Sequence, residues 1–151
     1  MGNDIKEIYL KGQEKFNKKD FFTTGFDDLD VFCKYLERGN ILTIGGRPAM
    51  GKTAFATSLV NHLLDKGKSI LYFSMDCSKV QCVSRLVAEK MGVHLFSIIE
   101  GKVSEKETDI VLDSYKDKNL EIVDKINLTI EDIETKIQET NLILFLLIMF
   151  N

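Results

Sequence analysis

Short apolar runs alternate with amphipathic segments from residue 41 to the end of the chain. The apolar runs, bounded by polar or turn residues, predict four strands: Ile41–Ile44, Ser69–Ser74, Leu120–Val123 and Leu142–Phe150. Between them, apolar residues recur at helical spacing, first over Thr53–Lys66. A near-continuous apolar strand such as Ser69–Ser74 is typical of a parallel sheet covered on both faces. The pattern therefore predicts an α/β fold with a mostly parallel sheet flanked by helices.

Capping signals mark where the later helices begin. A hydroxyl residue followed three positions later by Gln, Glu or Asp precedes three of the apolar periodic segments. The pairs are Ser78 with Gln81, Ser104 with Glu107, and Thr129 with Asp132. Gly67 is placed to end the helix predicted over Thr53–Lys66, as its C′ residue.

The N-terminal segment has a different character from the rest of the chain. Residues 3–16 predict a charged helix with a narrow apolar stripe of Ile5, Ile8 and Tyr9. Because so small a stripe buries little surface, we expect this helix to dock on another surface rather than stand alone. The polar run Lys18-Lys19-Asp20 then predicts a linker. We therefore divide the chain into a linker-type helix and polar linker, residues 1–20, and an α/β domain, residues 21–151.

A glycine-bounded loop follows the first predicted strand and carries the clearest chemistry. Its residues are Gly46-Arg47-Pro48-Ala49-Met50-Gly51-Lys52-Thr53, which satisfy the Walker A pattern G-x-x-x-x-G-K-[ST]. Gly46 and Gly51 permit the dihedrals and close approach needed to turn backbone N–H groups toward a phosphate. Lys52 supplies a charge for the β- and γ-phosphates, and the Thr53 hydroxyl can ligate Mg²⁺. The alternative is a strand-to-helix turn that binds nothing.

Composition and charge exclude several other classes. The chain has 151 residues and a net charge of −3, which gives no electrostatic footprint for nucleic acid. Three cysteines without paired spacing argue against a disulfide framework or a zinc site. The polar N-terminus is unlike a signal peptide, and the nine apolar residues of Leu142–Phe150 are too few to span a bilayer. A cytoplasmic location without a membrane partner is the resulting expectation.

Several motifs together resemble one family, the DnaB-type replicative DNA helicases with their RecA-like P-loop NTPase domain. Thr24-Gly25-Phe26-Asp27-Asp28-Leu29-Asp30 resembles the family's T-G-F-x-x-L-D entry to that domain. The loop residues from Arg47 to Thr53 are similar to its R-P-S-M-G-K-T, and Phe73-Ser74-Met75-Asp76-Cys77-Ser78 to its F-S-L-E-M-S. Arg85, Leu86 and the run Gly101-Lys102-Val103 fit the segments that follow. Residues 3–20 look like the linker helix that docks on a neighbouring subunit.

The resemblance implies ATP and Mg²⁺ bound between the subunits of a hexameric ring, with hydrolysis driving DNA unwinding in replication. It places the loop residues from Gly46 to Thr53 around the nucleotide, with Lys52 in a catalytic role and Thr53 on Mg²⁺. The family's catalytic Glu corresponds to Asp76, whose carboxylate would orient the attacking water. Asp is shorter by one C–C bond, about 1.5 Å, which is comparable to a costly misplacement. Asp76 either takes that role or is a polar residue ending a strand.

Two further departures from the family pattern lie outside the loop. Lys34 and Tyr35 stand where the family has two glycines, so the turn before the first strand is expected to differ. The apolar run Leu142–Phe150 lacks the Walker B Asp that ends the family's second nucleotide strand. The family's DNA-binding loops and inter-subunit arginine would lie beyond residue 151, as after a frameshift or premature stop. We therefore expect a RecA-like domain truncated after that strand, with doubtful DNA contact and no helicase activity alone.

Three functional hypotheses follow from these observations. The first is an ATP-binding domain of DnaB helicase type, for which single-turnover ATP hydrolysis would be diagnostic. The second is a non-catalytic interaction protein that joins or modulates a ring of full-length helicase subunits, for which copurification would be diagnostic. The third is a degenerate fragment without a role. Because an uncovered apolar strand edge pairs readily with another chain, self-association through residues 142–150 is also expected.

Overall fold

The structure of the chain, a computed structural model, describes residues 4–17, 22–32, 40–125, 127–140 and 146–148. The chain falls into two compact units, Met1–Thr43 and Ile44–Asn151. The boundary predicted after Asp20 lies on residues 18–21, outside the described residues, and stays a prediction. All of the predicted site residues, from Gly46 to Asp76, belong to the second unit.

The first unit contains helix α1 (Ile5–Asn17) and the short helix α2 (Asp27–Phe32). The helix predicted over residues 3–16 is thereby confirmed, and its apolar side chains are exposed, Ile5 by 82% and Tyr9 by 64%. Ahead of α2, the backbone N–H and the hydroxyl of buried Thr24 both donate to Asp30 Oδ1, at 2.6 and 2.7 Å. One carboxylate thus closes this turn, which explains why Thr24 and Asp30 occur at this spacing.

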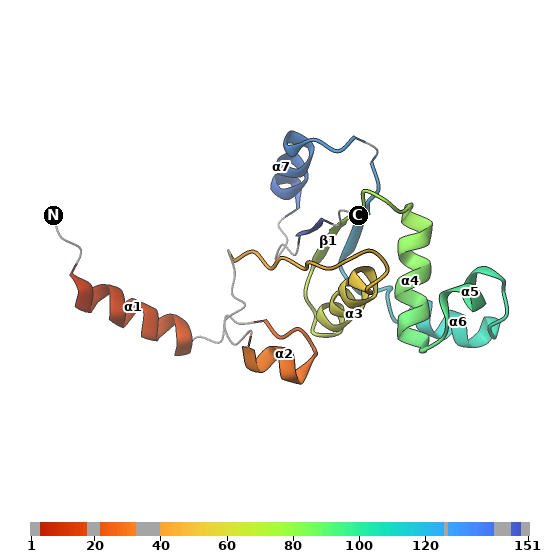
Figure 1. Ribbon diagram of the computed structural model, residues 1–151, viewed down its shortest axis with the longest axis horizontal. Coiled ribbons are helices and arrows are strands. Elements are labelled where there is room, and N and C mark those ends of the chain that lie inside the picture. The colour runs from red at the N-terminus through yellow and green to blue at the C-terminus, as the bar shows by residue number, and fades with distance from the viewer. Residues whose placement is uncertain (1–3, 18–21, 33–39, 126, 141–145, 149–151) are drawn as a thin grey trace. The chain divides into compact units, whose positions relative to one another are not determined.

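Among the described residues, the sheet of the second unit has three parallel strands in the order β2-β1-β3 (Figure 1). The central strand β1 (Ile70–Phe73) pairs with β2 (Leu120–Val123) and with β3 (Leu146–Ile148). All four residues of β1 are buried, as expected for a strand with neighbours on both edges and helices over its faces. The predicted α/β fold with a parallel sheet is confirmed.

The five helices described in this unit are α3 (Lys52–Asp65), α4 (Lys79–Met91), α5 (Leu95–Ile99), α6 (Glu105–Asp113) and α7 (Ile130–Glu139). Three of them, α4, α6 and α7, begin where the capping signals predicted. Ser78 and Thr129 each form a complete capping box, and Ser104 accepts a hydrogen bond from the backbone of Glu107. Gly67 follows α3 with φ of 71°, as predicted for a C′ residue. The short helix α5 had not been predicted.

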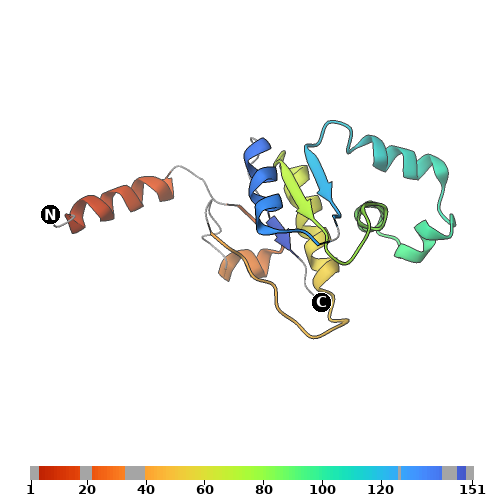
Figure 2. The same cartoon turned by 90° about the horizontal axis from the view of Figure 1, so that it is seen from above.

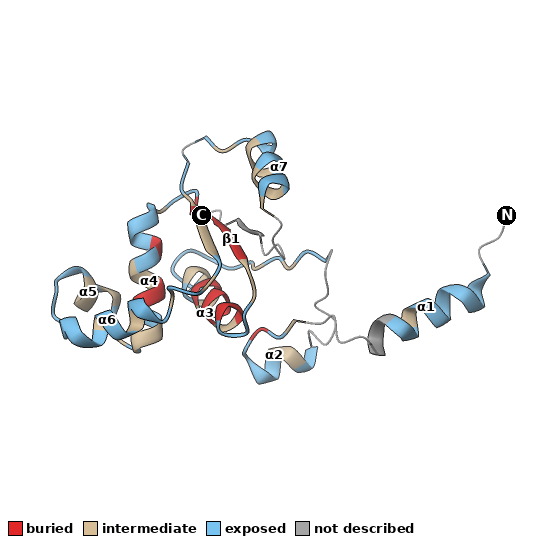
Figure 3. Cartoon of the chain, turned by 180° about the vertical axis from the view of Figure 1, so that it is seen from behind, coloured by how far each residue is buried: buried red, intermediate tan, exposed pale blue. Residues whose placement is uncertain are grey.

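The core lies where α3 packs against β1 and α4. Its largest fully buried side chains come from α3 and β1: Leu59, Leu63, Leu64, Ile70, Leu71 and Phe73. Figure 3 shows these buried segments of α3 and β1 beside the partly buried α4. Each such side chain contributes about 1.5–3 kcal/mol on burial, so this layer holds both the start of α3 and the end of β1 in place. None of the described helices is long and apolar enough to cross a membrane.

One predicted strand does not form. Residues 40–47 belong to no helix or strand, and the Ile41 side chain is 92% exposed. A strand is defined by pairing with a neighbour, and none of the three described strands pairs with residues 41–44. The prediction of a strand over Ile41–Ile44 is therefore wrong for this structure. Of the strand predicted over Leu142–Phe150, residues 146–148 form β3, and the others lie outside the described residues.

Candidate functional site

The predicted phosphate loop leads directly into α3. This helix and β1 run in opposite directions, because only residues 66–69 separate the end of α3 from the start of β1. The first turn of α3 therefore lies at the carboxyl end of the strands, and Figure 2 shows it at the same end as the arrowheads of β1 and β2. Ligands of open parallel sheets bind at this end.

The backbone of the loop adopts the conformation that the motif requires. Gly51, the N-cap of α3, has φ of 87° and ψ of 14°, and Ala49 is also left-handed with φ of 62°. The N–H of Met50 donates to the carbonyl oxygen of Arg47 at 3.3 Å, which tightens the turn. A left-handed alanine is strained, and such strain is concentrated at ligand-binding sites. Left-handed residues in a tight turn direct N–H groups to one side, as an anion requires.

The two glycines of the motif have different roles. Gly51 needs its freedom, since φ of 87° strains any residue with a side chain. At Gly46 an added Cβ would lie 3.5 Å from Lys52 Cγ, an ordinary contact, so the free loop has space for it. The predicted conformational requirement is therefore supported at Gly51, while Gly46 carries no comparable constraint in this structure.

The Lys52 side chain folds back across the loop. Its Nζ donates to the carbonyl oxygens of Gly46 at 3.1 Å and Arg47 at 3.2 Å. These two bonds hold the ammonium over the loop that precedes it. The positive charge therefore lies beside the backbone that would surround a phosphate. Arg47, Pro48 and Met50 complete the loop as exposed residues, with Met50 73% exposed.

The N-terminus of α3 remains available to an anion. It has no side-chain cap, and the Phe55 N–H is the first to bond within the helix, to the Gly51 carbonyl oxygen at 2.9 Å. The preceding N–H groups and the helix dipole provide a partial positive charge there. Among the described residues, no hydrogen bond engages the Thr53 hydroxyl; Thr57 instead donates to the Thr53 carbonyl oxygen at 2.8 Å. A free hydroxyl in the first turn is a suitable hard ligand for Mg²⁺.

Asp76 lies in the turn that follows β1. The Ser74 hydroxyl shapes this turn, because it donates to the Cys77 carbonyl oxygen at 2.7 Å and accepts from the Cys77 N–H at 3.2 Å. The Ser74 N–H in turn donates to the Val123 carbonyl oxygen at 2.8 Å, which ties the turn to β2. Asp76 is exposed at the carboxyl end of the sheet, where the loop also lies.

Two residues at this end had not been singled out as site residues. Asp124 directly follows β2, and its Oδ2 accepts from the Lys79 N–H at 2.6 Å, so this carboxylate joins the end of β2 to the start of α4. An acid immediately after an apolar strand was the signal that could have identified it. Arg85 lies on α4, and its Nε is buried without a hydrogen-bond partner among the described residues. No local sequence pattern predicts that the Arg85 Nε is buried without a partner.

Comparison with known proteins gives a consistent result. The family model for the DnaB-like helicase C-terminal domain matches residues 22–148. A probable replicative DNA helicase of Guillardia theta is 33% identical over 137 residues, which cover 88% of this chain and 23% of that protein. The replicative DNA helicase DnaB of Nostoc sp. is 35% identical over 82 residues, 54% of this chain and 9% of the relative. The chain thus spans about a quarter or less of the length of these relatives.

Solved structures share the fold at low identity. One solved ATPase domain superposes with a TM-score of 0.78 at 23% identity, over 93% of this chain and 53% of that one. A DnaB-like replicative helicase, described together with its interactions with primase, superposes with a TM-score of 0.78 at 24% identity. This match covers 93% of this chain and 36% of that one. The arrangement of the three strands and their helices is therefore that of these two structures.

Proposed function

This chain belongs to the family of DnaB-like helicase C-terminal domains, and on that premise we propose that its phosphate loop binds ATP together with Mg²⁺. The resemblance seen in the sequence motifs and the RecA-like fold that it implied are both confirmed. What we propose is that ATP with Mg²⁺ is the ligand of this loop. One observation carries it: the left-handed Ala49 and Gly51 close the loop onto an uncapped helix start, with the Lys52 ammonium held across it.

The residues present fit a bound nucleotide. The free N–H groups of the loop and of the first turn of α3 would hold the β- and γ-phosphates. Lys52 would exchange its bonds to the Gly46 and Arg47 carbonyl oxygens for bonds to phosphate oxygens, a stronger charge-assisted interaction. The Thr53 hydroxyl would hold Mg²⁺, and the ion would supply positive charge to offset that of the phosphates.

Asp76 is proposed to orient the water that attacks the γ-phosphate. Its carboxylate is exposed and set by the turn of residues 74–77 at the carboxyl end of β1. Because Asp is about 1.5 Å shorter than Glu, the carboxylate reaches less far than in the family's usual site. We therefore propose slow hydrolysis, if the ring that supplies the remaining residues is assembled.

Binding is tested by titrating Mg–ATP into the purified chain and its Lys52→Ala variant in a calorimeter. We expect Lys52→Ala to weaken binding at least about tenfold, because a charge-assisted bond to phosphate is lost. Lys66→Ala is the matched control, since Lys66 is exposed at the other end of α3. That variant should bind as the wild type does.

Two outcomes would contradict the proposal. One is equal affinity of the wild type and Lys52→Ala, which would place the nucleotide elsewhere. The other is no heat of binding for wild-type protein whose circular dichroism shows a folded α/β domain. Omitting Mg²⁺ and adding EDTA should weaken binding by the wild type, since Thr53 would then lose its shared ion.

The activity of a whole helicase is a wider proposal. The relatives are named as replicative DNA helicases, and the chain spans at most about a quarter of the two described above. We propose that this domain serves ATP-driven DNA unwinding in association with further copies of itself or with full-length DnaB-type subunits.

The exposed apolar side chains of α1 support the second candidate function. Ile5, Ile8, Tyr9 and Leu10 are 50–82% exposed, which is unusual for four apolar side chains on one 13-residue helix. A chain that docks this helix on a full-length helicase ring could modulate the ring without hydrolysing ATP. Comigration with such a ring in size-exclusion chromatography, without single-turnover hydrolysis, would favour this function over the first.

A further inference from the structure

The turn between β1 and α4 is attached at both of its ends to the carboxyl end of β2. At the first end, the Ser74 N–H donates to the carbonyl oxygen of Val123, the last residue of β2, at 2.8 Å. At the other end, the Lys79 N–H donates to Oδ2 of the following residue, Asp124, at 2.6 Å. Asp76 lies between these two attachments. Two consecutive residues of one strand end therefore hold the segment that carries the proposed water-orienting carboxylate.

The start of α4 is already capped by its own residues. Ser78 Oγ accepts from the Gln81 N–H at 3.3 Å, and Gln81 Oε1 accepts from the Ser78 N–H at 3.1 Å. This capping box starts the helix within four residues of sequence. Lys79 is exposed, so water could satisfy its N–H group without Asp124. The bond to Asp124 therefore attaches the start of α4 to β2 and is not what makes the helix begin there.

The bond between Asp124 and Lys79 has features of a strong hydrogen bond. A separation of 2.6 Å is short for an N–H···O bond, and bonds to an ionised carboxylate are charge-assisted. The positive end of the α4 dipole adds to the attraction, because Lys79 is the first residue of the helix. Within the turn, the Ser74 hydroxyl bonds to both backbone groups of Cys77, at 2.7 and 3.2 Å. The backbone on either side of Asp76 is therefore restrained.

We propose that Asp124 is a positioning residue for Asp76. By holding the first residue of α4 against the end of β2, the Asp124 carboxylate fixes the backbone from which Asp76 projects. An Asp side chain has one methylene between backbone and carboxylate, so the place of its carboxylate follows that of its backbone closely. This role rests on the proposed function for its purpose, the orientation of the attacking water, but not for its geometry.

Two substitutions remove the same bond from opposite sides. Asp124→Ala removes the acceptor. Lys79→Pro removes the donor and keeps the helix, because proline is favoured at the first helical position. Ser78 already has the extended backbone that a following proline requires, with φ of −67° and ψ of 156°. The matched controls are Lys79→Ala, which keeps the N–H group, and Asp109→Ala, which removes an equal charge at an exposed position of α6.

The readout is the order parameter of the Asp76 amide, from ¹⁵N relaxation of the full chain. We expect it to fall from about 0.85 in the wild type to below about 0.6 in Asp124→Ala and in Lys79→Pro. Both controls should match the wild type. Asp124→Asn keeps an oxygen acceptor and should retain at least about half of the lost order. The amide of Leu86, within α4, should keep its wild-type value in every variant.

The double variant shows whether Asp124 acts through this bond. Adding Asp124→Ala to Lys79→Pro should change the Asp76 order parameter by less than about 0.1, because the bond is already absent. Additive losses would show that Asp124 acts through another contact and would overturn the proposal. So would an Asp76 amide as ordered in both single variants as in the wild type, or a loss of order that extends through α4. Lys79→Pro and Asp124→Asn decide the question if Asp124→Ala folds poorly.

The outcome is separable from that of the proposed function. A wild type that binds no Mg–ATP, combined with the expected loss of order at Asp76, would refute the nucleotide site and leave the attachment by Asp124 intact. Where the wild type hydrolyses ATP in a single turnover, Asp124→Ala should slow this step at least about tenfold, with ATP affinity within about twofold of the wild type. An unchanged rate despite a disordered Asp76 would overturn the positioning role.

Discussion

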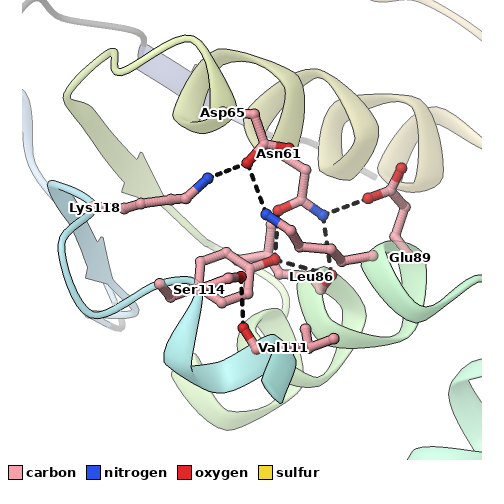
Figure 4. A network of polar contacts seen from close by, with 9 residues as sticks. Asn61, Asp65, Leu86, Glu89, Val111, Ser114 and Lys118 are labelled. Carbon is pink, nitrogen blue, oxygen red and sulfur yellow. Dashed lines mark hydrogen bonds and ion pairs between the residues drawn. The ribbon is translucent and has the colours of Figure 1, made fainter. Parts of the chain in front are cut away.

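At the scale of single residues, the buried Asn61 side chain forms hydrogen bonds with three partners. It is buried on α3, and its Nδ2 donates to the Leu86 carbonyl oxygen at 3.0 Å and to Glu89, both on α4 (Figure 4). The Tyr115 hydroxyl lies 2.6 Å from Asn61 Oδ1 and 3.2 Å from the same carbonyl oxygen. These bonds fasten α3 to α4 and thereby hold the phosphate loop and Asp76, which precede the two helices, in a fixed relation.

Charged groups surround this network. Burial alone would raise the pKa of Asp65, but hydrogen bonds from Lys118 and Lys90 lower it below its usual value. Lys90 Nζ lies 2.7 Å from Asp65 Oδ1 and 4.9 Å from the centre of the Tyr115 ring. Burial raises the pKa of Tyr115, so its hydroxyl remains a donor at neutral pH.

We expect Tyr115→Phe to lower the free energy of unfolding by about 1–2 kcal/mol, because it leaves the buried Asn61 Oδ1 without a donor. The ring and its contact with Lys90 are retained, so the substitution isolates the hydroxyl. Tyr9→Phe, at a 64% exposed position on α1, is the matched control and should change stability by less than about 0.5 kcal/mol. Urea denaturation measures the free energy of unfolding of both variants, provided that its dependence on urea concentration has the same slope as in the wild type. A Tyr115→Phe variant as stable as the wild type would show that water replaces the hydroxyl.

At the scale of elements, α7 depends on one capping carboxylate. Asp132 accepts from the N–H and the hydroxyl of Thr129, both at 3.0 Å, and from Lys125 Nζ at 2.7 Å. The Lys125 ammonium and the bonds from Thr129 lower the pKa of Asp132 to about 2. No residue of α7 is buried, so its start relies on this cap more than on core packing.

The sign of the pH dependence follows from this lowered pKa. Because the pKa of Asp132 is lower in the folded state, its carboxylate stabilises α7 at pH values above the ordinary Asp pKa of 3.8. This contribution is lost as the pH falls toward about 2. We therefore expect the NMR chemical shifts of the backbone amides of residues 130–139 to move toward random-coil values between pH 4 and pH 2. The amide shifts of the other helices should change less over this range.

Asp132→Asn should remove most of that pH dependence and leave α7 partly frayed at pH 5. Asp109→Asn, at an exposed position within α6, is the matched control and should keep the transition. Amide shifts of α7 that stay constant from pH 5 to pH 2 in the wild type would show that the cap does not depend on the charge of Asp132.

At the scale of the whole molecule, the two compact units differ in how much they bury. The apolar side chains described on α1 are exposed, and α2 buries none of its residues. In contrast, α3 buries seven residues and β1 buries all four. Because isolated short helices are marginal in water, the described side chains of α1 provide little burial to stabilise this helix.

Amide hydrogen exchange should therefore be uneven along the chain. We expect amides of α1 to exchange at least about 100-fold faster than those of α3, since opening α1 exposes no core. The measurement is exchange followed by mass spectrometry on dilute protein, with peptides of β1 as the protected reference. Protection of α1 equal to that of α3 would mean that the helix is docked, and loss of this protection on dilution would identify another copy as the partner.

The features that the sequence determined alone depend on contacts between near neighbours. The capping boxes at Ser78 and Thr129 join residues three apart. Gly51 is left-handed because the loop turns there into α3, which begins at the next residue, Lys52. The apolar runs of β1 and β2 likewise follow from local composition. Such interactions recur wherever the same few residues occur. These two strands, the starts of α4, α6 and α7, the left-handed turn before α3 and the family could therefore all be inferred from the order of residues along the chain.

Only the tertiary structure decided which distant groups meet. Whether Ile41–Ile44 forms a strand depends on a neighbouring strand that pairs with it, and none of the three described strands does. Tyr115 reaches Asn61 across 54 positions, and Asp124 reaches the start of α4 across 45. The unpartnered Nε of Arg85 is likewise visible only once burial is known. Contacts of this kind depend on how whole helices and strands pack. The separation of two residues along the sequence therefore says little about their distance in the folded chain.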